Sequence, residues 1–507
     1  MSFTFYIIAL PAILFISSLL NGRKFRAIPT VGSSDFPLLT YLGALNFARN
    51  GPALLQEGYE KFKGRIFKVS TFERWLVVIS GHKLVDEFQK LPEAKVSLNE
   101  SIAELINTRW IFGQSFHDNP YHVRVVQQQL TRHIGAAFPE IQDEIEVSFE
   151  ELLPVPANGE WVSVPVLSVM RQIVARVSNR VFVGLPYCRN ESYLDLAIRF
   201  MEDVDYGSYL LLFVPRWLKG LAARYLTNIN GRVDLVQGYL HDLLQKRVQD
   251  MESSGGDWED KPNDMLQWLM DEQAKTGDLD MKNVVRMILI INFAAISTSS
   301  MASASFTHVL YHLAANPEYI APLREEAETI IKEEGYTKVA MSRMRKIDSF
   351  LRESLRYNDI HAFTLMRKAM QDVHLSDGSV IPSGAIVLVP GLATHYDEAN
   401  YTDAATFDPW RFYNMREGEG NSLKYQYTNT ALDYMVFGHG KHACPGRFFA
   451  ANELKAMMVY TLLNYDVKFA NEGVRPPNKW VGLAVSPDPS AEVLFKRRVV
   501  SPDLKKG

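Results

Sequence analysis

The chain is organised around one stretch, FGHGKHACPGRFFA, which runs from Phe437 to Ala450. It contains Cys444, one of only two cysteines in the sequence, and an apolar helical pattern begins directly after it. Glycine permits left-handed backbone and lets a large flat ligand approach the main chain closely. A cysteine just before a helix start lies at the positive end of the helix dipole, where free N–H groups favour the thiolate. Such a thiolate is suited to be an axial iron ligand.

The spacing of this stretch resembles the haem-binding loop of the cytochrome P-450 superfamily. The matching pattern is Phe437-x-x-Gly440-x-His442-x-Cys444-x-Gly446. The resemblance implies that haem b is the cofactor, that the Cys444 thiolate is its iron ligand, and that Phe437, Gly440 and His442 lie around it. Most relatives carry arginine two residues before the cysteine, whereas this chain has His442.

Two other interpretations of Cys444 stay open at this point. Free cysteine is among the most buried residue types, so Cys444 fits an ordinary core position. Alternatively, Cys444 together with His439 and His442 has the residue types of a zinc site. The zinc interpretation is weaker because no second His/Cys pair lies at the usual spacing, and Cys188 is far away in the sequence.

Composition indicates one large catalytic unit. Of the 507 residues, 47% are apolar, and no linker, repeat or low-complexity run divides the chain. The net charge of −4 is mild, so we expect no nucleic-acid partner. Two cysteines provide no disulfide framework, which is typical of a reducing compartment.

The N-terminus predicts a membrane anchor. Residues 2–20 carry no charge, and this length spans about 30 Å of hydrocarbon. Arg23, Lys24 and Arg26 follow, and positive flanks tend to stay cytoplasmic. We therefore expect a single-pass anchor over residues 1–26 and a cytosolic catalytic domain over residues 27–507. A cleaved signal peptide fits less well, because the positive charge follows the apolar run instead of preceding it.

The longest helical pattern, residues 281–313, is expected to run through the core because apolar residues nearly surround it. Four hydroxyl residues, Ser297-Thr298-Ser299-Ser300, lie in its middle. Such side chains can bond back to helix carbonyls, which is the purely structural interpretation. The resemblance implies instead an oxygen-side groove in which Thr298 matches the family's threonine and Ser297 replaces its acid. We hypothesise that Thr298, Ser297 and ordered water carry protons.

A three-residue charge cluster is expected to support the cysteine loop. Glu353 and Arg356 are three apart, so they share one face of a helix expected over residues 345–359. The run Phe407-Asp408-Pro409-Trp410-Arg411-Phe412 resembles the family's Phe-x-Pro-x-Arg-Phe segment. The resemblance implies that Arg411 completes a buried cluster with Glu353 and Arg356, as a structural support and not as a catalyst.

Other positions matter only through the resemblance. Arg367 and His395 match residues that reach haem propionates, and arginine suits carboxylates by its planar fork. In the family, the helix that follows Pro120 offers a Trp and an Arg to a haem propionate. This chain lacks that pair, and His122 and Arg124 are the substitutes that it offers. Each of these positions also fits an ordinary surface or helix-start residue.

Two surfaces are candidates for partners. Residues 209–221 are unusually apolar and contain Trp217 between Arg216 and Lys219, which suits an entry region dipping into a membrane as well as a core helix. Lys441, Arg447 and Lys455 make the thiolate side basic. Complementary charge mainly speeds encounter, so this side would face an acidic NADPH-cytochrome reductase.

Taken in order, the motifs cover nearly the whole chain from about residue 29 to about residue 494. The chain is similar to eukaryotic microsomal members of the family. Its residues around Ser297 are similar to those of fungal members that oxidise terpenoids. The resemblance implies a mainly α fold with small β-sheets, preceded by a single transmembrane helix in the endoplasmic reticulum. We expect short hairpins over residues 65–80 and around Asp377-Gly378, whose sequence favours a tight turn.

The implied activity is a haem-thiolate monooxygenase. It inserts one oxygen atom from O₂ into a C–H bond of a lipophilic small molecule, with electrons from NADPH through a reductase. Three alternatives remain at the sequence level: a haem-thiolate isomerase or dehydratase that needs no reductase, a membrane-anchored zinc protein, and a helical scaffold without chemistry.

Overall fold

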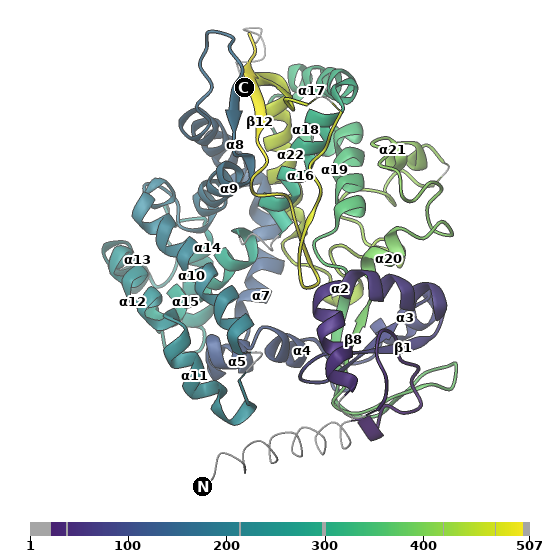
Figure 1. The fold of residues 1–507 in the computed structure, drawn as a ribbon. Helices are drawn as coiled ribbons and strands as arrows, with labels where there is room; N and C mark the ends of the chain where they lie inside the picture. The colour runs from purple at the N-terminus through teal and green to yellow at the C-terminus, as the bar shows by residue number, and fades with distance from the viewer. Residues whose placement is uncertain are drawn as a thin grey trace, which may run out of the picture.

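The computed structural model describes residues 22–36, 39–211, 214–296, 301–418, 420–471 and 473–499. Helices dominate these residues and pack around a central group, while the sheets lie toward different ends of the molecule (Figure 1). The longer helices are α2 Leu39–Lys61, α3 His82–Gln89, α4 Leu98–Leu105, α8 Thr131–Leu152, α9 Val166–Phe182, α10 Glu191–Leu211, α11 Lys219–Leu226, α12 Ile229–Tyr239, α13 His241–Ser254, α14 Met265–Ala274, α15 Met281–Ile296, α16 Met301–Ala315, α17 Ile320–Glu334, α19 Arg345–Asn358 and α22 Arg447–Asn464.

Shorter elements connect these helices and carry several of the site residues. They are α5 Thr108–Ile111, α6 Gln114–Asp118, α7 Tyr121–Val125, α18 Lys338–Arg343, α20 Gly391–His395, α21 Arg411–Arg416, the π-helix η1 Val126–Leu130 and the 3₁₀ turns η2 Tyr187–Arg189, η3 Arg216–Leu218, η4 Pro317–Tyr319 and η5 Gly440–His442.

The largest sheet of the described residues has the strand order β1-β2-β8-β5-β3. Its strands are β1 Ile66–Ser70, β2 Trp75–Ile79, β3 Val96–Ser97, β5 Thr364–Ala369 and β8 Ile386–Val389. The smaller sheets contain β4 Val162–Val164, β6 Val373–His374, β7 Val380–Ile381, β9 Tyr465–Lys468, β10 Lys479–Val481, β11 Ala484–Ser486 and β12 Val493–Arg497. The antiparallel pairs β1/β2 and β6/β7 confirm both predicted hairpins.

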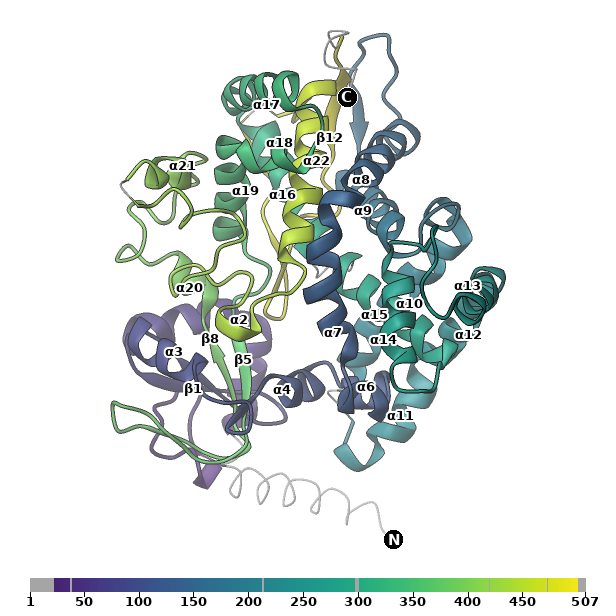
Figure 2. The same cartoon turned by 180° about the vertical axis from the view of Figure 1, so that it is seen from behind.

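The core is built from helices α8, α9, α15, α16 and α22, which lie against one another in both opposite views (Figures 1 and 2). Helix α22 is buried on nearly every side, because apolar residues run around its whole circumference. The long helix expected over residues 281–313 is described as α15 and α16. Residues 297–300, with Ser297 and Thr298, lie outside the described part of the chain.

The expected anchor over residues 2–20 also lies outside the described residues. Among the helices of the described segments, none combines the length and the apolar character that crossing a membrane requires.

A buried carboxyl group links α9 to α22 behind the cysteine loop. The Glu453 side chain is 1% exposed and accepts a 3.0 Å hydrogen bond from the Ser178 hydroxyl. Burial raises the pKa of Glu453 from 4.5 to about 8, and the Ser178 hydrogen bond lowers it only in part. Glu453 therefore stays protonated at neutral pH, which removes the free-energy penalty of a buried charge.

We expect Glu453→Gln to remove a pH dependence of stability. Between pH 4.5 and about 8 the folded chain keeps a proton that the unfolded chain releases, so stability falls as pH rises through this window. The slope is at most about 1.4 kcal/mol per pH unit, and glutamine has no such slope. We expect the free energy of unfolding of the variant, measured by denaturation at pH 5, 6, 7 and 8, to rise relative to that of the wild type as the pH increases. Exposed Glu252→Gln is the control, and parallel curves for Glu453→Gln would contradict the assignment.

Candidate haem-thiolate site

The cysteine loop folds back on itself through glycine backbone. Gly438 and Gly440 have φ of 69° and 67°, in the left-handed region that L side chains avoid. The Cys444 N–H donates to the Phe437 carbonyl at 2.7 Å and closes the loop. Gly440 is also restricted by space, because a Cβ built there would lie 2.2 Å from the Gln89 side-chain oxygen on α3.

The sulfur of Cys444 lies at the start of α22, as the sequence predicts. The backbone N–H groups of Gly446 and Arg447 donate hydrogen bonds to the sulfur. Burial raises the pKa of the Cys444 thiol, whereas these two donors and the Arg447 charge lower it, and burial prevails. Cys444 is half-buried, and a sulfur that receives two backbone donors is arranged to hold negative charge once a cation binds it.

Cys188 provides the contrast. It is fully buried, and burial together with the nearby Glu144 carboxylate raises the pKa of its thiol to about 12. Its sulfur lies 3.8 Å from a Glu144 oxygen, which disfavours a thiolate. The ordinary buried-cysteine interpretation therefore fits Cys188, and the iron-ligand interpretation fits Cys444.

The structure brings Glu353, Arg356 and Arg411 together. Glu353 and Arg356 are fully buried on α19 and form a two-point pair, with N–O distances of 2.7 and 2.8 Å. Arg411 Nε donates to the same Glu353 carboxylate at 3.2 Å. The remaining guanidinium donors of Arg356 bond to the carbonyls of His395 and Ala404 at 2.7 and 2.8 Å.

The same face of α19 carries two charged residues that sequence reasoning missed. Arg352 donates to the Asn429 carbonyl at 2.7 Å, and its guanidinium lies 3.6 Å from the Tyr434 ring centroid. Asp348 accepts from Arg416 at 3.1 Å and also pairs with Lys455. The spacing 348, 352, 356 was the available signal, but a charged helical stripe usually indicates a solvated face.

Arg367 lies on β5 and is 4% exposed. Burial lowers the pKa of its guanidinium to about 10, and among the described residues its recorded hydrogen bond is to the carbonyl of Met366 at 2.7 Å. Its charge lowers the pKa of His442, so the two side chains are close. Among the described residues no carboxylate lies within 4.0 Å of the Arg367 guanidinium, and the more distant Glu93 charge offsets the effect of burial on its pKa only in part. Such a guanidinium fits a carboxylate on a cofactor, so the residues present fit haem.

His122 is a second polar group that fits the cofactor. Its ring stacks on Phe116 at 5.2 Å between centroids, and its Nδ1 is buried without a hydrogen-bond partner in the described residues. Burial lowers the pKa of His122 to about 4, so the ring is neutral at pH 7. Arg124 does not share this place: it is 61% exposed and lies 3.6 Å from Glu272, which corrects its assignment as a substitute.

Three histidines have protein groups close to their ring nitrogens, although His395 Nδ1 and His442 Nε2 form no hydrogen bond among the described residues. His395 accepts from the Met435 N–H at 3.3 Å through Nε2, and its Nδ1 lies 3.1 Å from Asp359. This differs from the expected propionate contact and makes His395 part of the support beneath the loop. His442 Nε2 lies 3.1 Å from Glu93, and His439 Nδ1 lies 2.9 Å from Thr430. The two loop histidines therefore do not converge on Cys444 as zinc ligands would.

One member of the expected basic surface is also corrected. Lys455 is 8% exposed, and its Nζ pairs with Asp348 and donates to the Met341 carbonyl at 3.1 Å. It belongs to the core below the loop because its charge is already neutralised there. Lys441 remains exposed, and Arg447 is half-buried.

A helix-start cysteine with backbone donors, two left-handed glycines and a buried guanidinium without an acid partner define a haem-thiolate site. Comparison with known proteins agrees: the family model for cytochrome P-450 matches residues 32–495. The chain is 44% identical to cytochrome P-450 monooxygenase 151 of Postia placenta, over 93% of this chain and 94% of that protein. It is 31% identical to an ent-kaurene oxidase of Gibberella fujikuroi, over 96% and 95%.

The chain therefore belongs to the cytochrome P-450 family. It is an oxidoreductase of the monooxygenase class, whose cofactor is haem b with a cysteine thiolate ligand and whose co-substrates are O₂ and electrons derived from NADPH. The chain is also 36% identical to a cytochrome P-450 monooxygenase of Ganoderma lucidum, over 93% of this chain and 92% of that protein. The isomerase, zinc-protein and scaffold alternatives are not favoured.

We expect Glu353→Ala to yield little haem-loaded protein. Removing this carboxylate leaves two buried guanidinium groups uncompensated, and breaking such a cluster costs about 3–5 kcal/mol. The haem-to-protein ratio of the purified chain, from haem absorbance and total protein, measures the effect. Glu333→Ala, which removes an exposed surface pair with Arg343, should leave that ratio unchanged. A normal haem content in Glu353→Ala would contradict the supporting role.

Proposed function

We propose that this chain hydroxylates a lipophilic terpenoid or steroid-like metabolite, inserting one atom of O₂ into a C–H bond with electrons delivered from NADPH by a membrane-bound flavoprotein reductase. The observation that carries the proposal is the Cys444 sulfur, held at a helix start by two backbone donors. The terpenoid class is supported by the similarity of this chain to an ent-kaurene oxidase.

Bound haem supplies the activation of oxygen, and the chain's own residues hold and shield it. Cys444 ligates the iron, while the N–H groups of Gly446 and Arg447 stabilise the sulfur's negative charge. Phe437, which is 2% exposed and packs edge-on against Tyr427 at 5.4 Å, excludes water from the sulfur side. Gly440 leaves room for α3 against the loop.

The haem propionates would be bound by one cationic side chain and by neutral hydrogen-bond donors. Arg367 would pair with one propionate, because its guanidinium is buried without an acid partner. His442 lies beside Arg367, and His122 offers a neutral donor. Thr298 and Ser297 would move protons to the oxygen side. This assignment rests on their position in the sequence pattern.

We also propose that residues 1–26 anchor the chain in the endoplasmic reticulum membrane and that residues 27–507 form the cytosolic catalytic domain. Exposed apolar side chains on η3 and α11 support a membrane-facing surface: Trp217 is 81%, Tyr225 80% and Leu221 59% exposed. Lys219 does not contribute to it, because its Nζ is buried against Asn107 at 3.0 Å.

The reductase would approach the thiolate side. Lys441 is exposed there, and the Arg447 guanidinium lies 4.3 Å from the Phe448 ring centroid, close to the surface of the loop. With Lys455 removed from the set, the basic character of this side rests on Lys441 and Arg447. An acidic partner surface would complement them and speed encounter.

The spectrum of the reduced protein under carbon monoxide tests the ligand directly. We expect the long-wavelength band that is diagnostic of sulfur-ligated iron in the wild type and its loss in Cys444→Ser, because serine oxygen does not reproduce thiolate donation. Cys188→Ser is the matched control and should keep the band, since Cys188 lies beside Glu144 away from the loop. A folded wild type that binds haem without this band would overturn the proposal.

Turnover tests the reaction class and the proton route together. With a reductase, NADPH and ent-kaurene or a related diterpene hydrocarbon, we expect a product that carries one oxygen from ¹⁸O₂. Thr298→Ala should lower the product formed per NADPH consumed, because the hydroxyl that delivers protons is lost. Mass spectrometry of products and NADPH absorbance measure the ratio.

Thr307→Ala serves as the control for this assay. The Thr307 hydroxyl donates to the Ser303 carbonyl at 2.8 Å inside the same helical region, so its loss tests a hydroxyl without the proposed role. Unchanged coupling in Thr298→Ala would remove the proton-delivery hypothesis, and turnover without NADPH would point to the isomerase or dehydratase class.

A further inference from the structure

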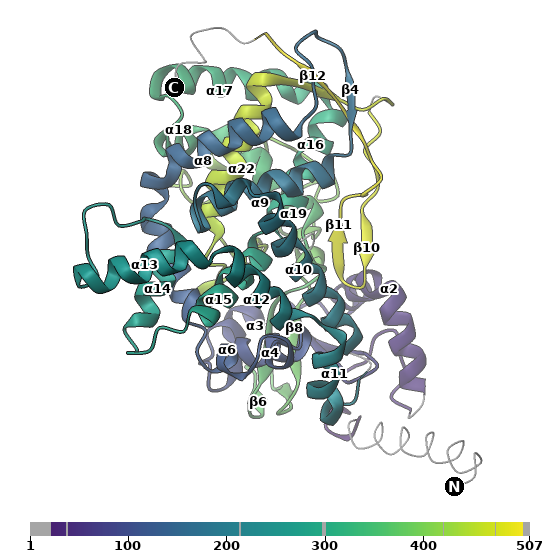
Figure 3. The same ribbon diagram turned by 90° about the vertical axis from the view of Figure 1, so that its left-hand side faces the viewer.

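The hairpin β10–β11 is joined to the segment that leaves α19. The Val485 N–H donates to the Ile360 carbonyl at 2.7 Å, and the Ala362 N–H donates to the Leu483 carbonyl at 2.8 Å. His361 and Ala484 form an antiparallel bridge between these two contacts. The hairpin therefore extends the segment Ile360–Phe363 as an added strand, and it reaches down beside α2 in the side view (Figure 3).

The segment Ile360–Phe363 is the direct link between two parts of the site. It follows the helix that carries Glu353 and Arg356, and it runs into the strand that carries Arg367. The segment continues directly into β5, so it sets where the strand that carries Arg367 begins, and the pairing of β5 with β8 holds the strand from there on.

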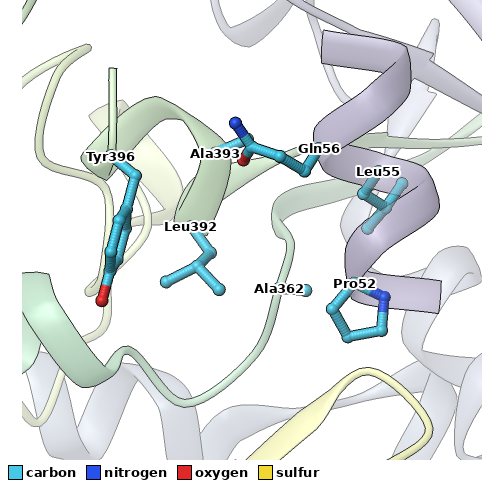
Figure 4. A pocket seen from close by; sticks show the side chains of 7 residues that line it. All are labelled: Pro52, Leu55, Gln56, Ala362, Leu392, Ala393 and Tyr396. Atoms are coloured by element: carbon cyan, nitrogen blue, oxygen red, sulfur yellow. The ribbon is translucent and has the colours of Figure 1, made fainter. Parts of the chain in front are cut away.

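Apolar packing and backbone hydrogen bonds together hold this segment. Ala362 is 2% exposed and belongs to an apolar cluster with Phe47 and Leu54. A pocket of about 350 Å³ lies between α2 and α20, and Ala362 lies on its wall between Pro52 and Leu392 (Figure 4). The two backbone hydrogen bonds to the hairpin add a directional constraint to this packing.

Arg475 anchors the base of the hairpin. Its Nη2 lies 2.6 Å from Asn358 Oδ1, 2.8 Å from Asn478 Oδ1 and 2.8 Å from His308 Nδ1. These partners come from the end of α19, from the residue before β10 and from α16. Asn358 is in turn 3.0 Å from His312, whose ring stacks on Phe407 at 3.7 Å.

The charge of Arg475 is unusual for its surroundings. Within the described residues it has no ion pair within 4.0 Å, and its Nε is buried without a partner. Burial lowers the pKa of Arg475, and its charge together with burial lowers the pKa of His308 well below 6.5, so His308 is neutral and accepts through Nδ1. Arg475 is half-buried, and a partly desolvated cation with neutral partners is a poor source of stability, whereas its planar fork fixes several acceptors in one arrangement.

We propose that Arg475 is a positioning residue of the haem-thiolate site: it locks the β10–β11 hairpin to α16 and α19, and the hairpin in turn fixes Ile360–Phe363 and the place of Arg367. The last step rests on the proposed role of Arg367 at a haem propionate. The lock itself rests only on the contacts of the hairpin and of Arg475.

The test compares Arg475→Gln with Arg324→Gln in the full-length, haem-loaded protein. Arg324 is a matched control: it is also a partly buried arginine that bonds to backbone carbonyls, those of Leu462 and Tyr465 at 2.7 and 3.2 Å, but it does not touch the hairpin. We expect hydrogen exchange of the Ala362 and Val485 amides to rise on the order of tenfold in Arg475→Gln, with α9 and α22 unchanged. Arg475→Lys keeps the charge but loses the planar fork, so the exchange rates of these amides should lie between those of Arg475→Gln and Arg324→Gln.

Two further measurements separate a local lock from a role in the site. Haem release to an acceptor protein should become several-fold faster in Arg475→Gln, and the ratio of 1-phenylimidazole to imidazole affinity, read from the haem spectrum, should change. Unchanged amides, or protection lost equally everywhere, would overturn the lock. Faster local exchange with unchanged haem release and azole ratio would overturn the role in the site. Absence of sulfur-ligated iron in the wild type would instead refute the proposed function, and the amide comparison would still test the lock.

Discussion

One carboxylate shared by two guanidinium groups holds the cysteine loop's surroundings in place. Glu353 lies at 0% exposure and is bonded by Arg356 and Arg411, and it also accepts the Asp408 N–H at 3.0 Å. Burying these charges is favourable only because every strong donor and acceptor finds a partner. The cluster thereby ties α19 to the chain between His395 and Arg411, which wraps beneath the loop. The cluster fixes how these segments are arranged more than it adds to the free energy of unfolding.

The same solution recurs around the site: buried guanidinium groups are satisfied by backbone carbonyls. Arg352 donates to Asn429, Arg356 to His395 and Ala404, and Arg411 to Thr406. Lysine would not serve here, because only the planar fork spans two or three carbonyls at once. Apart from His395, which ends α20, these carbonyls lie in irregular segments that no sheet or helix holds in place. Arg367 differs, because among the described residues it donates to a single neighbouring carbonyl, and for this reason we propose it as the partner of a cofactor carboxylate.

Sequence alone predicted the parts of the site that depend on local rules. The glycine pattern of the loop, the helix after Cys444 and the two hairpins follow from spacing and backbone chemistry, whereas the grouping of Glu353 with two arginines came from the family resemblance. Positions whose role depends on distant partners were not predictable. Lys455 looked like surface charge because its partner Asp348 is far away in the sequence, and His395 looked free because Asp359 and Met435 become neighbours only after folding. The cavity beside Ala362 likewise has no sequence signature.

The electrostatics of Cys444 explain why the loop and its supports are coupled to the cofactor. Burial raises the pKa of the thiol despite the Gly446 and Arg447 donors, so the sulfur is protonated until a cation binds it. Metal ligation requires the thiolate, so the thiol must be converted to the thiolate and release its proton. The donors must already be in place for this conversion to be favourable, because an unsolvated thiolate without them would be unstable. Rigid glycine turns and the shared carboxylate of Glu353 supply that preorganisation before the iron arrives.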